Sequence, residues 1–399
     1  MWTRRQFLAK SAASAAGLAL SSQGVFRDPA RAADDPDALR FLARYQECTD
    51  RALQWLARMQ ARDGHWEERG GMYSVPMTGL AGLALLCEGS TLTQGRFSRN
   101  IENAVEWLLS RIQPNGLIAD LRIEEERHRY MYGHGFALTF LSQVFGEENE
   151  PRKRELLRRA LERAVEFSAR AQTRLGGWGY VSSADGGGFD EGSVTITQLQ
   201  ALRAARDAGI PVPKETIDKA KDYLRKSTRV VRHDPDPRKR EAGVTYSLQG
   251  GGGGDVRPAL TAAGIACMFS AGEYENELAI QWLNFCMRSI PVGRAPHERI
   301  RHDEYTHFYY AQVIYVLGED RHAKMRPDLA EVERRDPSQR VLLKWSRYRE
   351  VMFEAIKSRQ SPDGSLSGSG NWGVGPVFAT AVYSIILQLD KAVLPIFQR

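Results

Sequence analysis

The chain has 399 residues, of which 42% are hydrophobic, 26% charged and 9% aromatic. This composition is typical of a globular protein and excludes the disordered and collagen-like classes. The formal charge of +6 comes from 55 basic residues against 49 acidic ones, and five of those bases stand against a single acid in the first 32 residues. The remaining chain is nearly balanced in charge, which excludes the strongly basic surface of a nucleic-acid binder.

The first 32 residues have the layout of a targeting signal. The adjacent pair Arg4 and Arg5 precedes a short Ala-rich apolar stretch, residues 12–20, which is too short to span a bilayer. The small residues Ala30 and Ala32 provide a cleavage site before Ala33. The sequence therefore predicts a twin-arginine signal over residues 1–32, a periplasmic or otherwise exported protein, and the twin-arginine translocase as a partner during export. An uncleaved anchor is the alternative, and no later run is apolar enough to be a transmembrane segment.

Residues 33–399 are predicted to form one domain built from repeated pairs of helices. In five places an apolar segment runs from a small or polar residue to a glycine eleven positions later, as expected for a buried helix with a glycine C-cap. These segments are 78–89, 135–146, 198–209, 261–272 and 307–318. A sixth apolar helix begins at Thr380 and lacks the terminal glycine.

Each apolar segment follows an amphipathic one, in which apolar residues recur at helical spacing and charged residues occupy the other positions. The amphipathic segments are 52–59, 104–112, 160–171, 217–226, 278–287 and 342–357. Six such hairpins bury their apolar helices if they close into a ring, so the sequence predicts an all-α fold, a six-hairpin α/α toroid. An open solenoid is the alternative, but the apolar helix from Thr380 to Leu389 does not suit an exposed end.

Two regions interrupt this pattern. Short extended turns are predicted at 176–181 and 244–248, and residues 230–258, with their Asp-Pro pairs and five consecutive glycines, are predicted to form a long loop. The four cysteines are scattered, which favours buried free thiols, with a Cys267–Cys286 bridge as the alternative.

A family resemblance lies in the turns between the helices. Gln60, Gly64 and Trp66 form a Gln-x-x-x-Gly-x-Trp motif, and the same motif recurs in full over residues 172–178 and in degenerate form from Gln113 and over 360–366. These copies resemble the repeats of the squalene cyclase and prenyltransferase superfamily. From the residues themselves we expect a structural role, in which Gln bonds backbone groups, Gly permits the turn and Trp covers the connection. The motif residues are Gln60, Gly64, Trp66, Gln172, Gly176, Trp178, Gln360 and Gly364.

The resemblance implies an α/α toroid whose central cavity binds isoprenoids, which family members cyclise or transfer to acceptors. Squalene cyclases place an Asp-x-Asp-Asp acid before the Thr-Ala that opens an inner helix, whereas no carboxylate stands at that place before Thr261 or Thr380 here. The zinc ligands of protein prenyltransferases and the Gly-Cys-Gly-Glu-Gln motif of thioester proteins are also missing from the sequence. The chain is therefore predicted to bind an isoprenoid or terpenoid-like ligand, without the family's cyclase mechanism.

Polar residues near the starts of the apolar helices are the candidates for a site. Asp190, Ser193 and Asp303 are expected to act as helix N-caps, and His134 and His307 as buried, hydrogen-bonded imidazoles. No compact ligand motif surrounds His302, so neither a metal nor a cofactor is predicted. Candidates for a catalytic role are Asp190, Asp303, Tyr305 and His307, and candidates for lining the cavity are Thr78, Tyr132, His134, Ser193, Thr261, Tyr309 and Thr380.

Three functions remain open at this point. The first is the isoprenoid-binding protein, and the second is a glycan-active toroid enzyme that uses Asp190, Glu191, Asp303, Tyr309 and Trp372. The third is a non-catalytic interaction scaffold. If six helix N-termini converge on one mouth, their free amides favour a ligand with an anionic head group, unless caps within the protein satisfy those amides.

Overall fold

A computed structural model describes residues 36–250, 254–270, 276–293, 300–368 and 374–398. The predicted signal at 1–32 and Trp372 lie outside the described residues. No helix in the described part of the chain is both long enough and apolar enough to cross a membrane.

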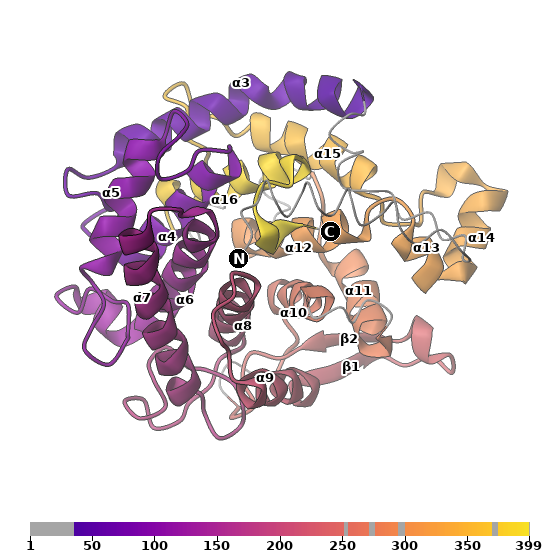
Figure 1. The fold of residues 1–399 in the computed structure, drawn as a ribbon. Helices are drawn as coiled ribbons and strands as arrows, with labels where there is room; N and C mark the ends of the chain where they lie inside the picture. The colour runs from indigo at the N-terminus through magenta and orange to yellow at the C-terminus, as the bar shows by residue number, and fades with distance from the viewer. Residues whose placement is uncertain (1–35, 251–253, 271–275, 294–299, 369–373, 399) are drawn as a thin grey trace, which may run out of the picture.

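An outer layer of amphipathic helices surrounds the molecule (Figure 1). Each turns its apolar face inward and leaves its charged residues in solvent, as the predicted periodicity requires. Six of them appear within the described ranges: α3 (Pro36–Met59), α5 (Ser98–Leu109), α7 (Pro151–Ala171), α9 (Lys214–Lys226), α11 (Glu277–Ser289) and α15 (Trp345–Lys357).

An inner layer of apolar helices forms a closed ring (Figure 1). Each inner helix packs on the next one, and the last packs on both the first inner helix and the first outer helix. The six in the described ranges are α4 (Ser74–Cys87), α6 (Glu124–Glu147), α8 (Gly192–Asp207), α10 (Pro258–Ser270), α12 (Asp303–Leu317) and α16 (Pro376–Gln388). The predicted six-hairpin α/α toroid is therefore confirmed, and the open solenoid is excluded.

The region expected to be a long loop contains a β-hairpin instead. Strands β1 (Thr228–Arg232) and β2 (Glu241–Val244) pair antiparallel, and a 3-10 turn, η1 (Pro237–Lys239), connects them. Strand β2 was not predicted because Glu241, Ala242 and Gly243 have low strand propensity. The strand is nevertheless buried, because it packs against α11. A second insertion projects from the ring between α12 and α15 (Figure 1). It contains α13 (Arg321–Met325), α14 (Pro327–Arg335) and η3 (Pro337–Gln339).

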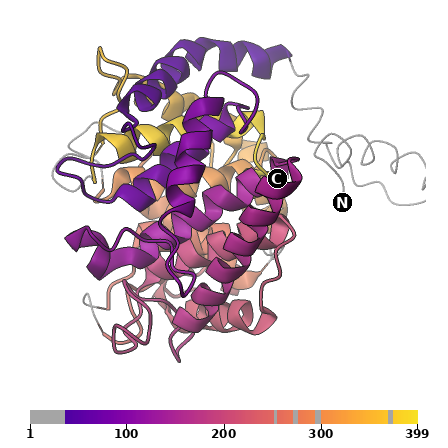
Figure 2. The ribbon, with the colours of Figure 1, turned by 60° about the vertical axis from the view of Figure 1, so that its left-hand side comes forward.

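The C-terminal residues cover the end of the ring where the inner helices finish. After α16 come two short 3-10 turns, η5 (Leu389–Lys391) and η6 (Pro395–Phe397), and the latter contacts α8. Ile396 and Phe397 are buried, the amide of Ile396 donates to Oε1 of Gln143 at 3.4 Å, and Phe397 packs edge-on against Phe308. Figure 2 shows this segment at one end of the ring, opposite the loops that lead into the inner helices. The ring is therefore plugged at that end.

The repeated glutamines join one hairpin to the next. The side-chain amide of Gln60 donates to the carbonyl of Gly64 at 2.8 Å and to that of Asn100, on the next outer helix, at 2.9 Å. Gln172 makes the same pair of bonds to Gly176 and to Thr216 on α9. Gln360 donates to Cys48 on α3 at 2.8 Å, so the motif also links the last repeat to the first. The degenerate Gln113 donates instead to Arg111 and Ala119.

The glycine and the tryptophan of the motif are explained by the close packing of neighbouring hairpins at this turn. A Cβ atom at Gly176 would lie 2.3 Å from the carbonyl oxygen of Lys219 on α9, and the φ of Gly176 is +95°. Gly64, Gly116 and Gly364 show the same combination. Trp178 is fully buried, and its indole N–H donates to the carbonyl of Ser168 at 2.7 Å. Trp66 is also fully buried and donates to Leu56.

Candidate functional site

We call the end of the ring at the N-termini of the inner helices the mouth. It is formed by the starts of α4, α6, α8, α10, α12 and α16 and by the turns that lead into them. Because the opposite end is plugged by residues 394–398, the mouth is the end at which polar side chains can meet a ligand.

Four predicted cavity residues hold the incoming turns in place. The backbone N–H of Trp66 donates to Oγ1 of Thr78 at 3.0 Å, and equivalent bonds recur in other repeats. Val244 donates to Thr261, Leu366 to Thr380 and Ile118 to Nδ1 of His134. Trp178 donates to Thr195, a residue that the sequence analysis did not single out. These side chains lie about one turn inside their helices, and in α6 further inside, so they do not mark the helix starts.

Both candidate histidines are fully bonded and buried. Nε2 of His134 contacts the hydroxyl of Ser168 at 2.9 Å, and burial lowers the pKa of His134 to about 4. His307 contacts the hydroxyl of Tyr348 at 2.9 Å and the carbonyl of Pro291 at 3.2 Å. Burial also lowers the pKa of His307, so both imidazoles are neutral at pH 7.

The candidate aspartates are buried in networks of their own and are not N-caps. Asp303 receives a hydrogen bond from Arg359 at 3.2 Å and one from the hydroxyl of Tyr383 at 3.3 Å. Asp190 accepts from the hydroxyl of Tyr223 at 2.8 Å and from the amide of Leu248 at 3.1 Å. The expected caps were wrong because these side chains have stronger partners on neighbouring elements. Ser193 lies inside α8, whose N-cap is Glu191.

Glu191 is the centre of a cluster of hydroxyl groups at the mouth. It is 1% exposed; the hydroxyl of Ser193 donates to it at 2.6 Å and that of Tyr132 at 3.2 Å. Tyr132 also bonds Ser193, and the hydroxyl of Tyr305 lies 3.5 Å from the Ser193 carbonyl. Burial raises the pKa of Glu191 and raises the pKa values of Tyr132 and Tyr305 well above 10.

Two more tyrosines lie beside this cluster. The hydroxyls of Tyr180 and Tyr246 bond each other, and the ring of Tyr180 is 6.0 Å from that of Tyr132. Burial raises the pKa of Tyr246, and the negative charge of Glu191 and the hydrogen bond to Tyr180 raise it further. Tyr132, Tyr180, Tyr246 and Tyr305 all keep part of their surface exposed. Neither Tyr180 nor Tyr246 was among the candidates from the sequence, although Tyr180 stands two residues after the tryptophan of its motif copy.

Glutamate side chains accept hydrogen bonds from backbone amides at the starts of inner helices. Oε1 of Glu126, from the first turn of α6, accepts the amide of Val75 in α4 at 2.8 Å. Oε2 of Glu191 accepts the amide of Val194 at 2.8 Å, and Oε1 of Glu68 accepts the amide of Phe378 in α16 at 2.8 Å. At three of the six inner helices described, protein carboxyl groups therefore satisfy amides that an anionic ligand would otherwise bind.

Glu68 is the least satisfied of these carboxyl groups. It is 3% exposed, and within the described residues its Oε2 has no hydrogen-bond partner. A Cβ atom at Gly375 would lie 1.9 Å from this oxygen, so the glycine provides the space that the carboxyl group fills. Burial raises the pKa of Glu68 to about 7, and the backbone amides of Phe378 and Val377 and the charge of Arg69 only partly oppose that rise.

Glu68 should therefore make folding stability depend on pH. The pKa of Glu68 is higher in the folded chain than in the unfolded one. The contribution of Glu68 to the unfolding free energy is therefore fully present below about pH 4.5 and is lost as the pH rises through about 7. Between pH 5 and pH 8, Glu68 should lower the unfolding free energy of the wild type by about 2–3 kcal/mol. We expect Glu68→Gln to lack this decrease when both proteins are unfolded by urea titration. The exposed Glu125→Gln serves as the control, and an identical pH dependence in wild type and Glu68→Gln would contradict the assignment.

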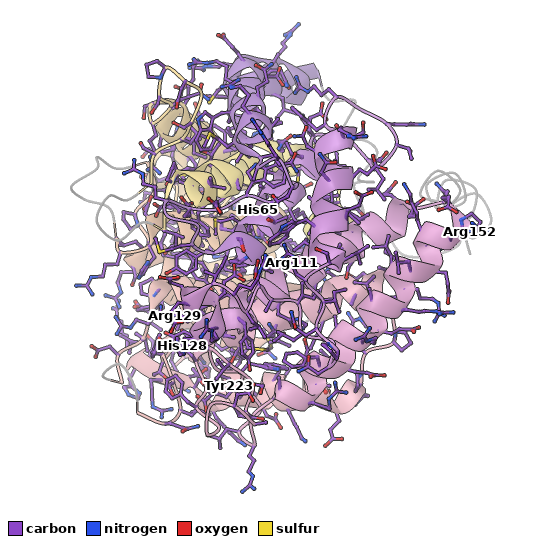
Figure 3. The ribbon with its side chains drawn as sticks, turned by 90° about the vertical axis from the view of Figure 1, so that its left-hand side faces the viewer. His65, Arg111, His128, Arg129, Arg152 and Tyr223 are labelled. Carbon is purple, nitrogen blue, oxygen red and sulfur yellow. The ribbon has the colours of Figure 1, made fainter. Side chains whose placement is uncertain are left out.

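A polar cleft of about 570 Å³ lies beside the mouth, between the turns that precede α4 and α6. His65 lies in it between two carboxylates, with Nδ1 at 2.5 Å from Asp63 and Nε2 at 2.9 Å from Glu67. The rings of His65 and Trp107 stack at 4.9 Å, and the guanidinium of Arg111 lies 4.6 Å from the same indole ring. Figure 3 shows His65 and Arg111 on this side of the molecule.

Acidic side chains dominate the wall of the cleft. Asp120 accepts from Arg111 at 3.1 Å and from Arg122 at 2.7 Å, and its bonds to Arg122 lower its pKa despite partial burial. Glu67, Glu124 and Glu125 complete the acidic lining. Such a cleft suits a neutral polar ligand or a cation. Within the described residues no group of three His, Cys, Asp or Glu side chains is arranged to hold a metal ion, and all four cysteines are free.

No family model and no curated protein matches the chain. Among solved structures, an inactive variant of the α-1,6-mannanase of Salegentibacter sp. in complex with α-1,6-mannotriose is similar, with a TM-score of 0.54, 9% identity and coverage of 87% of this chain and 99% of that one. A type II terpene cyclase from Scytonema in complex with the substrate geranylgeranyl dihydroxybenzoate has a TM-score of 0.53, 14% identity and coverage of 88% and 99%. Both are α/α toroid enzymes, and at this identity the likeness shows the fold alone.

Proposed function

We propose that the protein binds an uncharged, largely apolar ligand of the isoprenoid or terpenoid class, with one oxygen group held at the mouth. The observation that supports this most directly is the cluster of Glu191, Ser193 and Tyr132, surrounded by partly exposed tyrosine rings. Hydroxyl groups and a carboxyl group provide donors and acceptors for an alcohol or carbonyl, and the rings provide apolar contact area.

The charge at the mouth supports a neutral head group. Glu68, Glu126 and Glu191 already accept helix amides, so a phosphate or carboxylate there would compete with buried protein carboxyl groups. Burial raises the pKa values of all three glutamates, so these carboxyl groups ionise less readily than exposed ones.

The same electrostatics argue for binding rather than for proton-initiated cyclisation. Protonating an alkene requires an unusually strong acid, whereas a carboxylic acid with a raised pKa is a weaker acid than usual. None of the four residues before Thr261 or the four before Thr380 is acidic, so the acid position of squalene cyclases holds no carboxyl group in this chain.

Calorimetric titration of the purified protein tests this function. We expect an uncharged triterpene alcohol to bind, and Tyr132→Phe or Glu191→Gln to weaken it by roughly tenfold, about the worth of one hydrogen bond to a polar group. Tyr45→Phe is the matched control, because this hydroxyl bonds Glu354 on the outer layer at 2.7 Å. Equal binding of a polyprenyl phosphate, or no effect of either mouth variant, would contradict the proposal.

A glycan is the second candidate ligand, and the acidic cleft around His65 is the observation that favours it. Glycan-active enzymes use carboxyl groups in open polar clefts, and the mannanase shares this fold. Saturable binding of α-1,6-mannotriose that is lost in Glu67→Gln, with no binding of the triterpene alcohol, would replace the first proposal by this one.

We also propose that residues 1–32 direct export through the twin-arginine pathway, on the basis of Arg4, Arg5 and the apolar stretch that follows them. The double variant Arg4→Lys with Arg5→Lys is expected to remain in the cytoplasm, as judged by fractionation and immunoblotting. Unchanged export of the double variant would refute this assignment.

A further inference from the structure

The β-hairpin between α9 and α10 stands out from the ring and leads into the mouth. Figure 1 shows β1 and β2 at the periphery, with the turn that connects them directed away from the centre. Val230 in β1 pairs with Ala242 in β2, and Tyr246, beside the Glu191 cluster, follows Ala242 by roughly 13 Å of extended chain. A partner of the hairpin is therefore brought close to the rim of the mouth.

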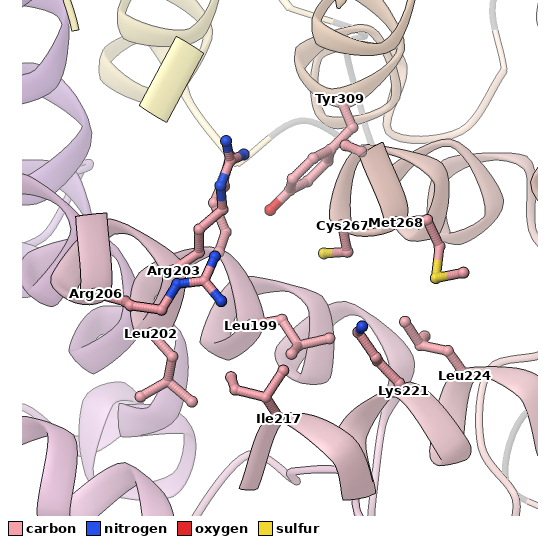
Figure 4. A pocket seen from close by; sticks show the side chains of 12 residues that line it. Leu199, Leu202, Arg203, Arg206, Ile217, Lys221, Leu224, Cys267, Met268 and Tyr309 are labelled. Carbon is pink, nitrogen blue, oxygen red and sulfur yellow. The ribbon is translucent and has the colours of Figure 1, made fainter. Parts of the chain in front are cut away.

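Helices on both sides hold this hairpin in place. Figure 4 shows Ile217 and Leu224 of α9 directed toward side chains of α8 and α10 across a small crevice. Strand β2 is buried and packs against α11. The side-chain amide of Asn284 in α11 donates to the carbonyl groups of Arg238 and Arg240 at 2.9 and 2.8 Å. The position of the hairpin relative to the mouth is therefore fixed.

Basic side chains dominate the exposed surface of the hairpin. Residues 226–240 contain two Asp residues against six Lys and Arg residues, which are Lys226, Arg229, Arg232, Arg238, Lys239 and Arg240. Of these six, only Arg232 forms an ion pair within the described chain, to Glu241 at 3.4 Å, and Glu241 also lies 2.5 Å from Arg288. Asp234 and Asp236 accept backbone amides of the turn instead. The segment therefore has a local excess of positive charge, although the whole chain is nearly balanced.

Two exposed valines lie in the middle of this basic segment. Val230 and Val231 are each 43% exposed, and Arg229 and Arg232 flank them in β1. Val231 is the extra residue of a β-bulge, because the register with β2 shifts between Val230 and Arg232. The bulge and the arginines make β1 a poor template for a further strand. The valines are therefore available to a partner other than a β-strand.

The composition of this surface discriminates among anionic partners. Residues 226–240 contain no Trp, Tyr or Phe. Aromatic residues dominate the binding energy of protein interfaces and form the stacking surfaces for single-stranded nucleic acids. An anionic bilayer requires no aromatic residue, because its phosphates attract Lys and Arg and the boundary between headgroups and acyl chains accepts aliphatic side chains. A bilayer therefore fits this surface better than an acidic protein or a nucleic acid.

We propose that the hairpin of residues 226–244 docks the protein on an anionic lipid bilayer. Val230 and Val231 enter the boundary between headgroups and acyl chains, and the six bases lie against the lipid phosphates. Arginine suits this arrangement, because its aliphatic stem covers apolar surface while its charged end stays in the polar layer. The docked hairpin holds the rim of the mouth near the bilayer, whichever ligand the mouth binds.

Sedimentation of the purified chain with lipid vesicles tests the docking. We expect the chain to bind vesicles of phosphatidylcholine that contain one third phosphatidylglycerol, and to bind phosphatidylcholine alone at least tenfold more weakly. Each Lys or Arg near an anionic bilayer strengthens binding roughly fivefold, so several bases together exceed this ratio. Binding should also weaken as the salt concentration rises.

The basic part of the surface is tested by Arg238→Gln with Lys239→Gln, two exposed residues at the end of the hairpin. This double variant should bind the anionic vesicles at least tenfold more weakly. The matched control is Arg334→Gln with Arg335→Gln, an adjacent exposed pair in α14, which should bind as the wild type does. All variants keep the predicted signal at 1–32, so a difference between them comes from the substituted residues.

The apolar part is tested by Val230→Thr with Val231→Thr, which keeps branched side chains in β1. This variant should bind the anionic vesicles several-fold more weakly, whereas Val332→Thr, at an exposed valine of α14, should have no effect. Thermal unfolding of every variant at the wild-type temperature verifies that the fold is intact.

Hydrogen exchange locates the contact without any substitution. Amides of residues 226–240 should exchange more slowly on the anionic vesicles than in solution, while those of α14 remain unchanged. No binding to anionic vesicles, equal binding to phosphatidylcholine alone, or unchanged exchange of residues 226–240 would overturn the proposal. Binding of polyglutamate as tightly as the vesicles, with no effect of the valine variant, would also overturn it and indicate an acidic polypeptide as the partner.

Discussion

We expect Trp178→Ala to lower the free energy of unfolding by roughly 3–5 kcal/mol, the usual cost of removing a large buried aromatic side chain. Trp178 is fully buried, and its indole N–H donates to the Ser168 carbonyl at 2.7 Å. The substitution leaves a cavity between two hairpins and an unpaired carbonyl group on α7. Urea titration with a two-state fit measures the change.

Trp178→Phe is the control for this substitution, because it keeps an aromatic ring in the site and removes the hydrogen bond. It should cost about 1–2 kcal/mol, clearly less than the alanine variant. A loss below about 1 kcal/mol for Trp178→Ala would show that the tryptophan is not a structural contact and is available to a ligand.

We expect Gly176→Ala to destabilise the protein by a similar amount, roughly 3–5 kcal/mol, although it adds only one methyl group. Two effects combine at this position. The φ of +95° is strained for any residue with a Cβ atom, and that atom would lie 2.3 Å from the carbonyl oxygen of Lys219. The carbonyl belongs to the backbone of α9, so relief requires a shift of the whole helix.

Gly188→Ala separates these two effects. Gly188 also has a positive φ, +81°, but an added Cβ atom would meet nothing within 4 Å. This variant should therefore lose only the conformational part, about 1 kcal/mol. Equal losses in the two variants, compared by thermal and urea unfolding, would show that the approach of α9 to the turn is unimportant.

The helices of this fold could be predicted because their burial is encoded locally. The inner helix α4 is buried along its whole length, and its segment is apolar all round; the outer helices bury one face and show the matching periodicity. The Gln-x-x-x-Gly-x-Trp motif could also be interpreted, because most bonds of Gln172 and Trp178 stay within one repeat or reach the next.

The mouth could not be predicted in the same way, because its contacts connect different repeats. Glu126 bonds the start of α4, and Glu68 bonds the start of α16, which lies at the other end of the sequence. Nothing in the local pattern indicates which helix an acidic side chain will meet. The start of α6 was hidden for another reason: its first turn is charged and is separated from the rest by a kink at Arg129, so the apolar pattern begins later than the helix.

Closure of the ring affects how the protein can unfold. The indole N–H of Trp55 donates to Asp363 at 3.0 Å, and Gln360 bonds the carbonyl of Cys48, so the first hairpin depends on the last. An open array of helical pairs can fray from either end, because each terminal pair has a single neighbour. Here every hairpin has two neighbours, so no pair can detach without breaking contacts on both sides. Unfolding is therefore expected to be cooperative across the whole ring, and nascent N-terminal hairpins stay incomplete until the C-terminal hairpin has been synthesised.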